Sequence, residues 1–275
     1  MTGQTETKSQ WGAYSPHASD RLLLLTRRLG LAHGPIKHFI SRVWLKRHPD
    51  SPVDISYHNI KYRLYPVDNT VDLKILFGSK YRDQVELDAL VKATRNGGVF
   101  IDIGANTGYY SLTAAAAGAA RTVAIEPYPP TFERLQFNIA TNGFGDRIDT
   151  VQCALGDHTG EAVLYVPEVG DVGSSRISEH AIAGNPVTVP LKPLADLLEE
   201  QSVTHIDAMK IDVEGMEDAV LLPYFAANAA ERWPDLIIIE HISSNDWRRD
   251  VMAWMLENGY AKTAQTRSNT LLKKC

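Results

Sequence analysis

The sequence predicts an open α/β fold in which helices cover a mostly parallel, doubly wound sheet. Short apolar runs alternate with helix-length segments over residues 99–154 and again from residue 206 to the C-terminus. This alternation is typical of parallel strands joined by right-handed crossovers. A turn with two glycines follows the first apolar run, and open α/β folds hold nucleotide-like ligands at such a turn.

Residues 1–95 precede this alternation and are expected to form an N-terminal extension. Residues 1–18 are polar and lack a period, which predicts a disordered tail. Asp20–Leu31 is a predicted helix with an N-cap at Ser19 or Asp20. Ile36–Arg47 is a second predicted helix, whose apolar face would carry Ile36, Phe39, Ile40 and Val43.

A hairpin and a further helix are expected between these helices and the core, within an extension that covers residues 19–95. Ile55–Tyr65 alternates apolar and polar residues, and Leu73–Phe77 is the expected partner strand after a turn at Asp68-Asn69. Tyr81–Thr94 has the apolar period of a helix. Asn96-Gly97-Gly98 ends this helix and leads into the first core strand.

The two N-terminal helices are strongly basic. Seven Lys or Arg residues and no acidic residue lie between Arg21 and Arg47. Two interpretations stay open. The charges either face water on a docked helix pair, or they contact an anionic membrane surface or an anionic substrate.

The core, expected over residues 96–275, ends in two strands near Ala261–Thr266 and Thr270–Lys273 that fit an antiparallel terminal hairpin. An insertion at 157–198 interrupts it, with strands at 162–166 and 187–191. Between them, Glu168–Pro186 is rich in Gly, Ser and Asn, which is typical of a lid or binding loop. The other core strands are expected at 99–103, 122–126, 148–154, 206–211 and 235–240, and the helices at 108–119, 130–142, 215–229 and 246–258.

The turn after the first core strand indicates the type of ligand. Asp102-Ile103-Gly104-Ala105-Asn106-Thr107-Gly108 spaces its glycines as G-x-x-x-G and not as the dinucleotide pattern G-x-G-x-x-G. Glycines here would let the backbone approach the ligand and adopt conformations that a Cβ blocks. The carboxylate of Asp102 would repel a pyrophosphate but attract the sulfonium and ammonium groups of S-adenosylmethionine.

A second carboxylate strengthens this interpretation. Glu126 ends the second core strand, 22 residues after Gly104, which is the spacing of a carboxylate that binds ribose hydroxyls. In the alternative interpretation Asp102 caps the turn and Glu126 is a solvated strand-end residue. A buried acid without a partner is costly, which favours the ligand interpretation.

With these motifs the chain resembles the FkbM family of S-adenosylmethionine-dependent methyltransferases. The resemblance rests on VFIDIGANTGYYSL, AIEPYPPTFERLQFNI, MKIDVEGMEDAVL and LIIIEH, and it covers Tyr81 to the C-terminus. It implies a Rossmann-like class I methyltransferase sheet, S-adenosyl-L-methionine as cofactor, and O-methylation of a hydroxyl on a sugar, glycolipid or secondary metabolite. The usual methyltransferase pattern has a glycine where this chain has Asn106. The FkbM family also lacks that glycine.

The expected cofactor-binding residues come from the ends of three strands. Cys153–Leu155 ends the third strand, and the resemblance implies that a backbone group here meets the adenine edge. Cys153 itself is expected to be a small buried side chain and not a nucleophile. The full expected set is Asp102, Gly104, Ala105, Asn106, Gly108, Glu126 and Ala154.

Charged residues at the ends of the fourth and fifth core strands are the catalytic candidates. An alcohol is a poor nucleophile while protonated, so a base is expected near the acceptor. We expect Asp212 or His241 to be this base and Glu214 to orient the acceptor or the base. In the structural alternative Lys210 pairs with Asp212 or Glu214, and one of these acids caps the next helix.

Two further groups of residues are candidates without a recognisable motif. Asp212, Glu214, Glu240 and His241 offer metal-ligand atoms, but their spacing matches no metal motif, and we expect no metal. Gly173–Arg176 in the insertion offers hydroxyls and a guanidinium. These groups would suit a polyhydroxylated or anionic acceptor, or equally an ordinary surface loop.

Composition narrows the class of protein. A net charge of −5 argues against a nucleic-acid partner. Two distant cysteines, Cys153 and Cys275, predict no disulfide framework and fit a reducing cytoplasm. Neither an apolar run of about 18 residues nor a signal-peptide core is present. The remaining alternatives are a non-catalytic cofactor-binding module and an NAD-dependent oxidoreductase, which would need the absent G-x-G-x-x-G turn.

Overall fold

A central seven-stranded sheet organises the computed structural model, which describes residues 10–28, 34–49, 52–77, 83–168, 171–178 and 182–275. Its strands are β3 (Val99–Ile103), β4 (Arg121–Ile125), β5 (Ile148–Val151), β10 (Ala208–Ile211), β11 (Leu236–Glu240), β12 (Tyr260–Gln265) and β13 (Asn269–Lys274). The order is β12-β13-β11-β10-β3-β4-β5. The single strand that runs opposite to the rest is β13, which pairs antiparallel with both β11 and β12, while the other pairs are parallel. The predicted doubly wound sheet with an antiparallel terminal hairpin is therefore confirmed.

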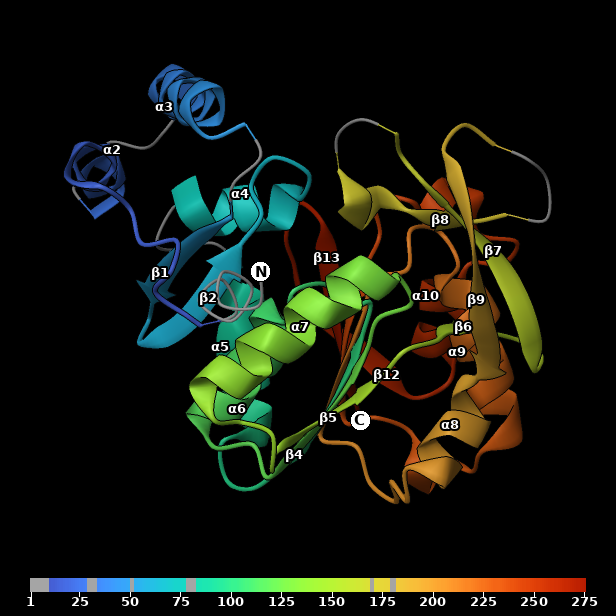
Figure 1. Cartoon of the computed structure of the whole chain (residues 1–275). Coiled ribbons are helices and arrows are strands. Elements are labelled where there is room, and N and C mark those ends of the chain that lie inside the picture. Colours follow the sequence, from blue (N-terminus) through green and yellow to red (C-terminus); the bar gives the residue numbers. More distant parts are fainter. Residues whose placement is uncertain (1–9, 29–33, 50–51, 78–82, 169–170, 179–181) are drawn as a thin grey trace.

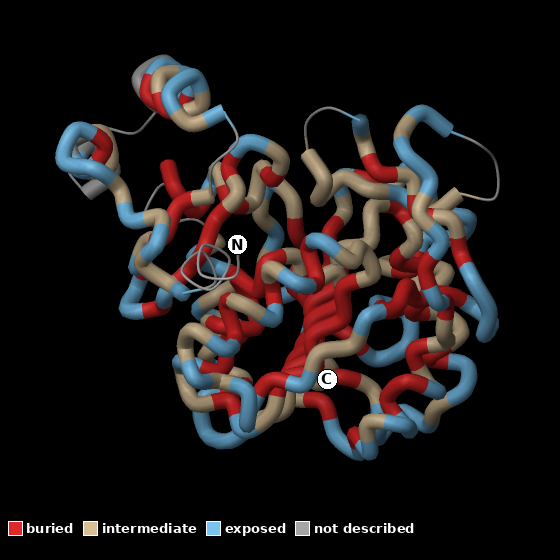
Figure 2. Tube along the Cα trace, viewed as in Figure 1, coloured by how far each residue is buried: buried red, intermediate tan, exposed pale blue. Residues whose placement is uncertain are grey.

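Helices cover both faces of this sheet (Figure 1). Its inner strands are buried, and their red tubes cross the centre of Figure 2. Strands that are buried on both faces need continuous apolar runs, which is why LIIIE and AMKI contain so few polar residues. Phe100 and Ile101 point to opposite faces and belong to separate apolar clusters. The covering helices are α5 (Gln84–Thr94), α6 (Tyr109–Ala117), α7 (Pro129–Asn142), α9 (Glu217–Ala227) and α10 (Val251–Glu257).

The insertion forms a second, four-stranded sheet. Its strands are β6 (Ala154–Gly156), β7 (Gly160–Val166), β8 (Arg176–Ile177) and β9 (Asn185–Pro193), in the order β6-β9-β7-β8. The antiparallel pair β7 and β9 confirms the two strands expected here. The expected strand at 148–154 is too long, because β5 ends at Val151 and Ala154 already pairs with β9. Helix α8 (Leu194–Glu200) then leads back to the main sheet.

The N-terminal extension contains the two expected helices, α2 (Ala18–Arg28) and α3 (Gly34–Arg47). The expected hairpin is wrong. Strands β1 (Val53–Tyr57) and β2 (Ile60–Leu64) pair with each other through His58 and Asn59, which both have positive φ. Residues 70–77 form helix α4 (Thr70–Phe77) and not a strand.

A side-chain cap explains why α4 is a helix. Oδ1 of Asn69 accepts hydrogen bonds from the backbone N–H groups of Val71, at 2.9 Å, and Asp72, at 3.2 Å. An asparagine in this position satisfies the free amides of a first helical turn. The Asp68-Asn69 signal therefore starts a helix, whereas the sequence analysis assigned it to a turn between strands.

Details of the first two helices also differ from expectation. The expected N-cap at Ser19 or Asp20 is wrong, because α2 already begins at Ala18. On α3, Phe39 is 68% exposed, while Ile40 and Trp44 are the buried apolar residues. The apolar face is therefore rotated toward Trp44, whose ring lies 5.6 Å from that of Phe77 in α4.

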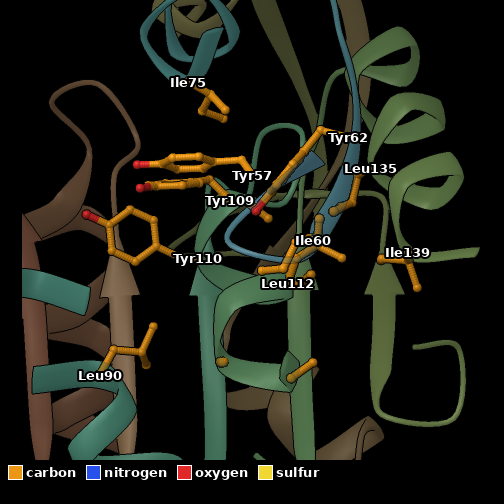
Figure 3. Packing of buried hydrophobic residues seen from close by; sticks show 14 of the residues in the cluster. Tyr57, Ile60, Tyr62, Ile75, Leu90, Tyr109, Tyr110, Leu112, Leu135 and Ile139 are labelled. Atoms are coloured by element: carbon orange, nitrogen blue, oxygen red, sulfur yellow. The ribbon is translucent and has the colours of Figure 1, made fainter. Parts of the chain in front are cut away.

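Residues 10–17, which the sequence analysis assigns to a disordered tail, contact the hairpin. Backbone N–H groups of Gly12 and Tyr14 donate to Oδ2 of Asp54 at 2.8 and 3.0 Å. The hairpin in turn packs on the main sheet's helices, and Figure 3 shows Ile60 and Tyr62 beside Leu112 and Leu135. Over the part of the chain that is described, no helix is both long and apolar enough to span a bilayer.

Candidate functional site

A cavity of about 270 Å³ lies beyond the carboxyl ends of β3, β4, β10 and β11. This edge is where open α/β sheets hold their ligands. Two of the expected residues, Gly108 and His241, do not line the cavity, and Gly108 instead precedes α6 as its N-cap. The expected residues that do line it are Asp102, Gly104, Ala105, Asn106, Glu126, Ala154, Asp212 and Glu214.

The glycines of the first turn serve packing inside the protein. Gly104 has φ +76°, and a Cβ there would lie 2.0 Å from the backbone oxygen of Asp212. Gly108 has φ +95°, and its Cβ would lie 2.7 Å from Cδ1 of Leu135. The expected left-handed conformations are therefore confirmed, and the space where each Cβ would lie is occupied by the protein itself. Asn106 has φ +52°, a conformation that asparagine tolerates better than most residues.

Glu126 is held rigidly at the end of β4. Its Oε2 accepts from the backbone N–H of Asn106 at 2.9 Å, and its Oε1 accepts from that of Tyr128 at 3.1 Å. Burial raises the pKa of Glu126 to about 7, although these two hydrogen bonds favour the charged form. Each carboxylate oxygen keeps a second lone pair, so the group can still accept hydroxyl hydrogen bonds from the cavity.

Asp102 joins β3 to α6. Its Oδ2 accepts from both the backbone N–H and the hydroxyl of Ser111, at 3.0 and 2.6 Å. The side chain is buried, and this burial raises its pKa, while the charge of Lys210 opposes the rise. The capping interpretation of Asp102 is thus confirmed by these hydrogen bonds, and Asp102 also lines the cavity.

Lys210 and Asp212 form an ion pair, as the structural alternative predicted. Nζ of Lys210 lies 3.0 Å from Oδ2 of Asp212 and 5.0 Å from the centre of the Tyr110 ring. Burial lowers the pKa of Lys210, but the charges of Asp212 and Asp102 outweigh it and leave the pKa above its ordinary value. The lysine therefore stays charged beneath the cavity.

The expected helix cap at Asp212 or Glu214 is wrong. Oε1 of Glu217, in the first turn of α9, accepts from the backbone N–H of Val213 at 2.9 Å, and its Oε2 accepts from that of Gly215 at 3.1 Å. Because Glu217 satisfies these amides, the carboxylates of Asp212 and Glu214 stay available to the cavity.

Glu214 has a strongly perturbed environment at this end of the cavity. Its backbone has φ +55°, a strained conformation that is common at functional sites. Burial, followed by the charges of Asp212 and Glu240, raises its pKa to about 7. The nearest cation to oppose this rise is the guanidinium of Arg176, 4.0 Å away.

Glu240 and His241 end β11 in different environments. Oε1 and Oε2 of Glu240 accept from the backbone N–H groups of Ile242 and Ser243 at 2.5 and 3.3 Å, and burial raises the pKa of Glu240. Nδ1 of His241 lies 3.1 Å from the hydroxyl of Thr270, away from the cavity lining. Among the described residues, the side chains that reach metal-ligand spacing are His205, Asp207 and Asp235, and not Asp212, Glu214, Glu240 and His241.

The insertion closes one side of the cavity by docking on α4. Oδ1 of Asp171 accepts from the backbone N–H groups of Thr70 and Gly173, both at 3.0 Å, and the Thr70 hydroxyl donates to Oδ2. The N–H of Val172 donates to the backbone oxygen of Asp68 at 2.7 Å. These contacts hold the expected binding loop against the first turn of helix α4.

The residues of α4 and α6 that line the cavity are not among the expected site residues. Lys74 falls in the strand expected at Leu73–Phe77, and Thr70 and Val71 lie between the expected turn and that strand. The Asn69 cap was the signal that would have placed all three on a helix. Tyr109 and Tyr110 also line the cavity, and Figure 3 shows the Tyr109 ring beside that of Tyr57, with Tyr110 below. Tyr109 and Tyr110 therefore give the cavity an aromatic wall.

The lining is rich in acidic side chains. Carboxylates outnumber ammonium groups by seven to two, the two being Lys74 and Lys210. Such a lining repels phosphate-bearing ligands and attracts cationic ones. The seven acids are Asp83, Asp102, Glu126, Asp171, Asp212, Glu214 and Glu240.

Comparisons with known proteins agree with this geometry. The family model described as the methyltransferase FkbM domain matches residues 102–262. No curated protein matches the chain.

Among solved structures, the chain is similar to an uncharacterized protein from Listeria monocytogenes serotype 4b (13% identity, 69% of this chain, 67% of that chain, TM-score 0.42). It is similar to the C-terminal domain of precorrin-6Y C5,15-methyltransferase from Rhodobacter capsulatus (19% identity, 71% of this chain, 88% of that chain, TM-score 0.41). It is also similar to a putative tRNA (m1A22) methyltransferase from Streptococcus pneumoniae in complex with S-adenosyl-L-methionine (11% identity, 69% of this chain, 72% of that chain, TM-score 0.42).

Proposed function

The chain belongs to the FkbM methyltransferase family, whose cofactor is S-adenosyl-L-methionine, and from this premise we propose that it methylates a hydroxyl oxygen of a sugar, a glycolipid or a secondary metabolite. The observation that carries the proposal is the acidic cavity at the carboxyl edge of the sheet. This lining suits a cofactor that bears a sulfonium and an ammonium group and no phosphate.

Residues at the ends of three strands would hold the cofactor. The carboxylate of Glu126 would accept hydrogen bonds from the ribose hydroxyls, since its two oxygens are fixed by Asn106 and Tyr128. Asp102 and the turn 104–106 would hold the methionine part, and residues 153–155 would line the adenine. When bound, the cofactor supplies an activated methyl group whose leaving group is already built in.

The carboxylates at the ends of β10 and β11 would act on the acceptor. Glu214 is the group best matched to take a hydroxyl proton near neutral pH, because its pKa is raised to about 7. Oδ2 of Asp212 is engaged by Lys210, which supports an orienting role for Asp212. His241, expected as an alternative base, lies outside the lining and is not included in the proposal.

The lining at this end supports a polyhydroxylated acceptor. The rings of Tyr109 and Tyr110 offer flat apolar faces, and Ser175, Ser268 and Asn269 offer hydrogen-bonding groups. Oδ1 of Asn269 has no hydrogen-bond partner among the described residues, while its Nδ2 donates to Glu86 at 2.9 Å. A hydroxyl donor would satisfy this buried oxygen.

Product identification tests the proposal. The protein would be incubated with methyl-labelled S-adenosylmethionine and a lysate-derived metabolite pool, and labelled products would be identified by mass spectrometry. We expect label on the oxygen of a hydroxylated product, and loss of that label with Glu214→Gln. Label on nitrogen, carbon or sulfur, or no transfer from any pool, would contradict O-methylation.

A further inference from the structure

Helix α3 presents an aromatic ring and two cations to solvent. Phe39 is 68% exposed, the largest value among the exposed large hydrophobic side chains of the described residues. Arg42 and Lys46 are exposed as well. Their spacing of three and four residues places all three on the same face of the helix.

The opposite face of α3 is anchored, so this orientation is fixed. Trp44 is 1% exposed and packs edge-on against Phe77 of α4, and Ile40 is also buried. Turning Phe39 inward would withdraw Trp44 from its site, which would expose a much larger apolar surface.

Among the described residues, acidic side chains do not pair with the cations on this face. The buried carboxylate of Asp20 lies 3.9 Å from Arg47 and 3.3 Å from His48. The ion pairs found in the described parts of the chain include neither Arg42 nor Lys46. On α2, Arg21 and Leu25 are exposed one helical turn apart, which repeats the combination of a cation and an apolar group.

We propose that Arg21, Leu25, Phe39, Arg42 and Lys46 form a docking surface for an anionic lipid bilayer. Apolar side chains that enter the boundary between headgroups and acyl chains, beside cations that face the phosphates, are typical of helices that lie on membranes. The chain as a whole carries a charge of −5, so the attraction is local to this surface. A nucleic acid would also use the cations and stack a base on Phe39, whereas the aliphatic side chain of Leu25 suits only the lipid.

One helix, α4, separates the docking surface from the cavity. Helix α3 packs on α4 through its buried face (Figure 1), and Thr70, Val71 and Lys74 of α4 line the cavity. Docking is therefore independent of the proposed function.

Vesicle sedimentation tests the docking. The full chain would be spun with vesicles of phosphatidylcholine alone and of phosphatidylcholine mixed with phosphatidylglycerol. We expect binding to the mixed vesicles only, with loss at high salt because surface charges are then screened. Each basic residue near an anionic surface is worth about 1 kcal/mol, so Arg42→Gln/Lys46→Gln should weaken binding roughly 30-fold. Phe39→Ser should weaken it at unchanged salt dependence.

A matched control separates this surface from overall charge. Lys92→Gln/Lys262→Gln removes two exposed cations elsewhere on the chain, and it should leave vesicle binding unchanged. Calorimetry with S-adenosylhomocysteine should give wild-type affinity for all variants, which shows that the fold and the cofactor site are intact.

Three outcomes would overturn the proposal. These are equal binding by wild type and the Arg42/Lys46 variant, no binding of wild type to anionic vesicles, and binding of single-stranded RNA, but not vesicles, that depends on the same residues. None of them bears on methyl transfer, so failure here is distinguishable from failure of the proposed function.

Discussion

The Glu126→Gln variant isolates the group proposed to bind the ribose. The wild-type side chain is 8% exposed, and its pKa rises from the ordinary value of 4.5 to about 7. At 1.36 kcal/mol per pH unit, the ionised group destabilises the ligand-free protein by about 3 kcal/mol. The contribution of Glu126 to the stability of the ligand-free protein should therefore be most favourable below pH 4.5, fall as the pH rises from 4.5 to 7, and stay level above pH 7.

Glutamine should remove this pH dependence without unfolding the chain. The variant keeps one oxygen, so one of the backbone amides of Asn106 and Tyr128 loses its acceptor, at a cost of about 1–3 kcal/mol. Relief of the buried charge offsets most of this loss above pH 7. If the free energy of unfolding of the variant at pH 8 is close to that of the wild type, a loss of ligand affinity can be assigned to the removed carboxylate.

Affinity for S-adenosylhomocysteine, measured by calorimetry, is the decisive readout. Hydrogen bonds to a charged group contribute about 1.5–3 kcal/mol, so Glu126→Gln should bind roughly 10- to 150-fold more weakly at pH 8. Wild-type affinity should fall roughly tenfold from pH 8 to pH 6 as Glu126 takes up a proton, and the variant should lack this dependence.

The exposed Glu133 of α7 provides the matched control, because Glu133→Gln removes a carboxylate outside the cavity lining. It should change neither the affinity nor its pH profile. Wild-type affinity in Glu126→Gln, or a wild-type affinity that does not vary with pH, would refute the assignment of Glu126 to the ribose.

Three further predictions test the packing around the cavity. Gly104→Ala and Gly143→Ala both place an alanine at positive φ, but only the first clashes, 2.0 Å from the oxygen of Asp212. Urea denaturation should show a loss of about 1–2 kcal/mol for Gly143→Ala and more than about 4 kcal/mol for Gly104→Ala, and equal losses would contradict the packing role. Glu214→Gln should raise the free energy of unfolding by about 1–3 kcal/mol at pH 8 but not at pH 4, because it removes an ionised, half-buried carboxylate; a loss of stability at pH 8 would show that the ionised carboxylate does not destabilise the fold. Asp171→Ala should speed amide exchange over residues 171–177 by at least about tenfold, and unchanged exchange would show that another contact holds the loop.

The strands of the core could be predicted from the sequence alone, because strands that are buried on both faces are continuous apolar runs. Runs such as VFIDI and LIIIE are continuous and apolar, and each is bounded by turn residues, so their order predicted the sheet. The acids at the strand ends followed from the same pattern, because parallel strands bring their carboxyl ends to one edge. Eight of the ten expected site residues accordingly line the cavity.

The errors lie where tertiary contacts override local patterns. Residues 70–77 contain enough apolar positions for a strand or a helix, and the Asn69 cap decides for the helix. Gly108 matches the glycine pattern, but its contact is Leu135 across the helix pair. His241 ends a strand as expected, yet its ring turns to Thr270 of the neighbouring strand, which is remote in sequence. Leu135 and Thr270 lie far from Gly108 and His241 in the sequence, so a pattern of neighbouring residues does not reveal these contacts.

A crystal structure of the complex with S-adenosylhomocysteine tests the central claim most directly. The account predicts the ribose hydroxyls within hydrogen-bond distance of the Glu126 carboxylate, and the sulfur at the end of the cavity lined by Asp212 and Glu214. A ligand outside this cavity, or a ribose turned away from Glu126, would contradict it.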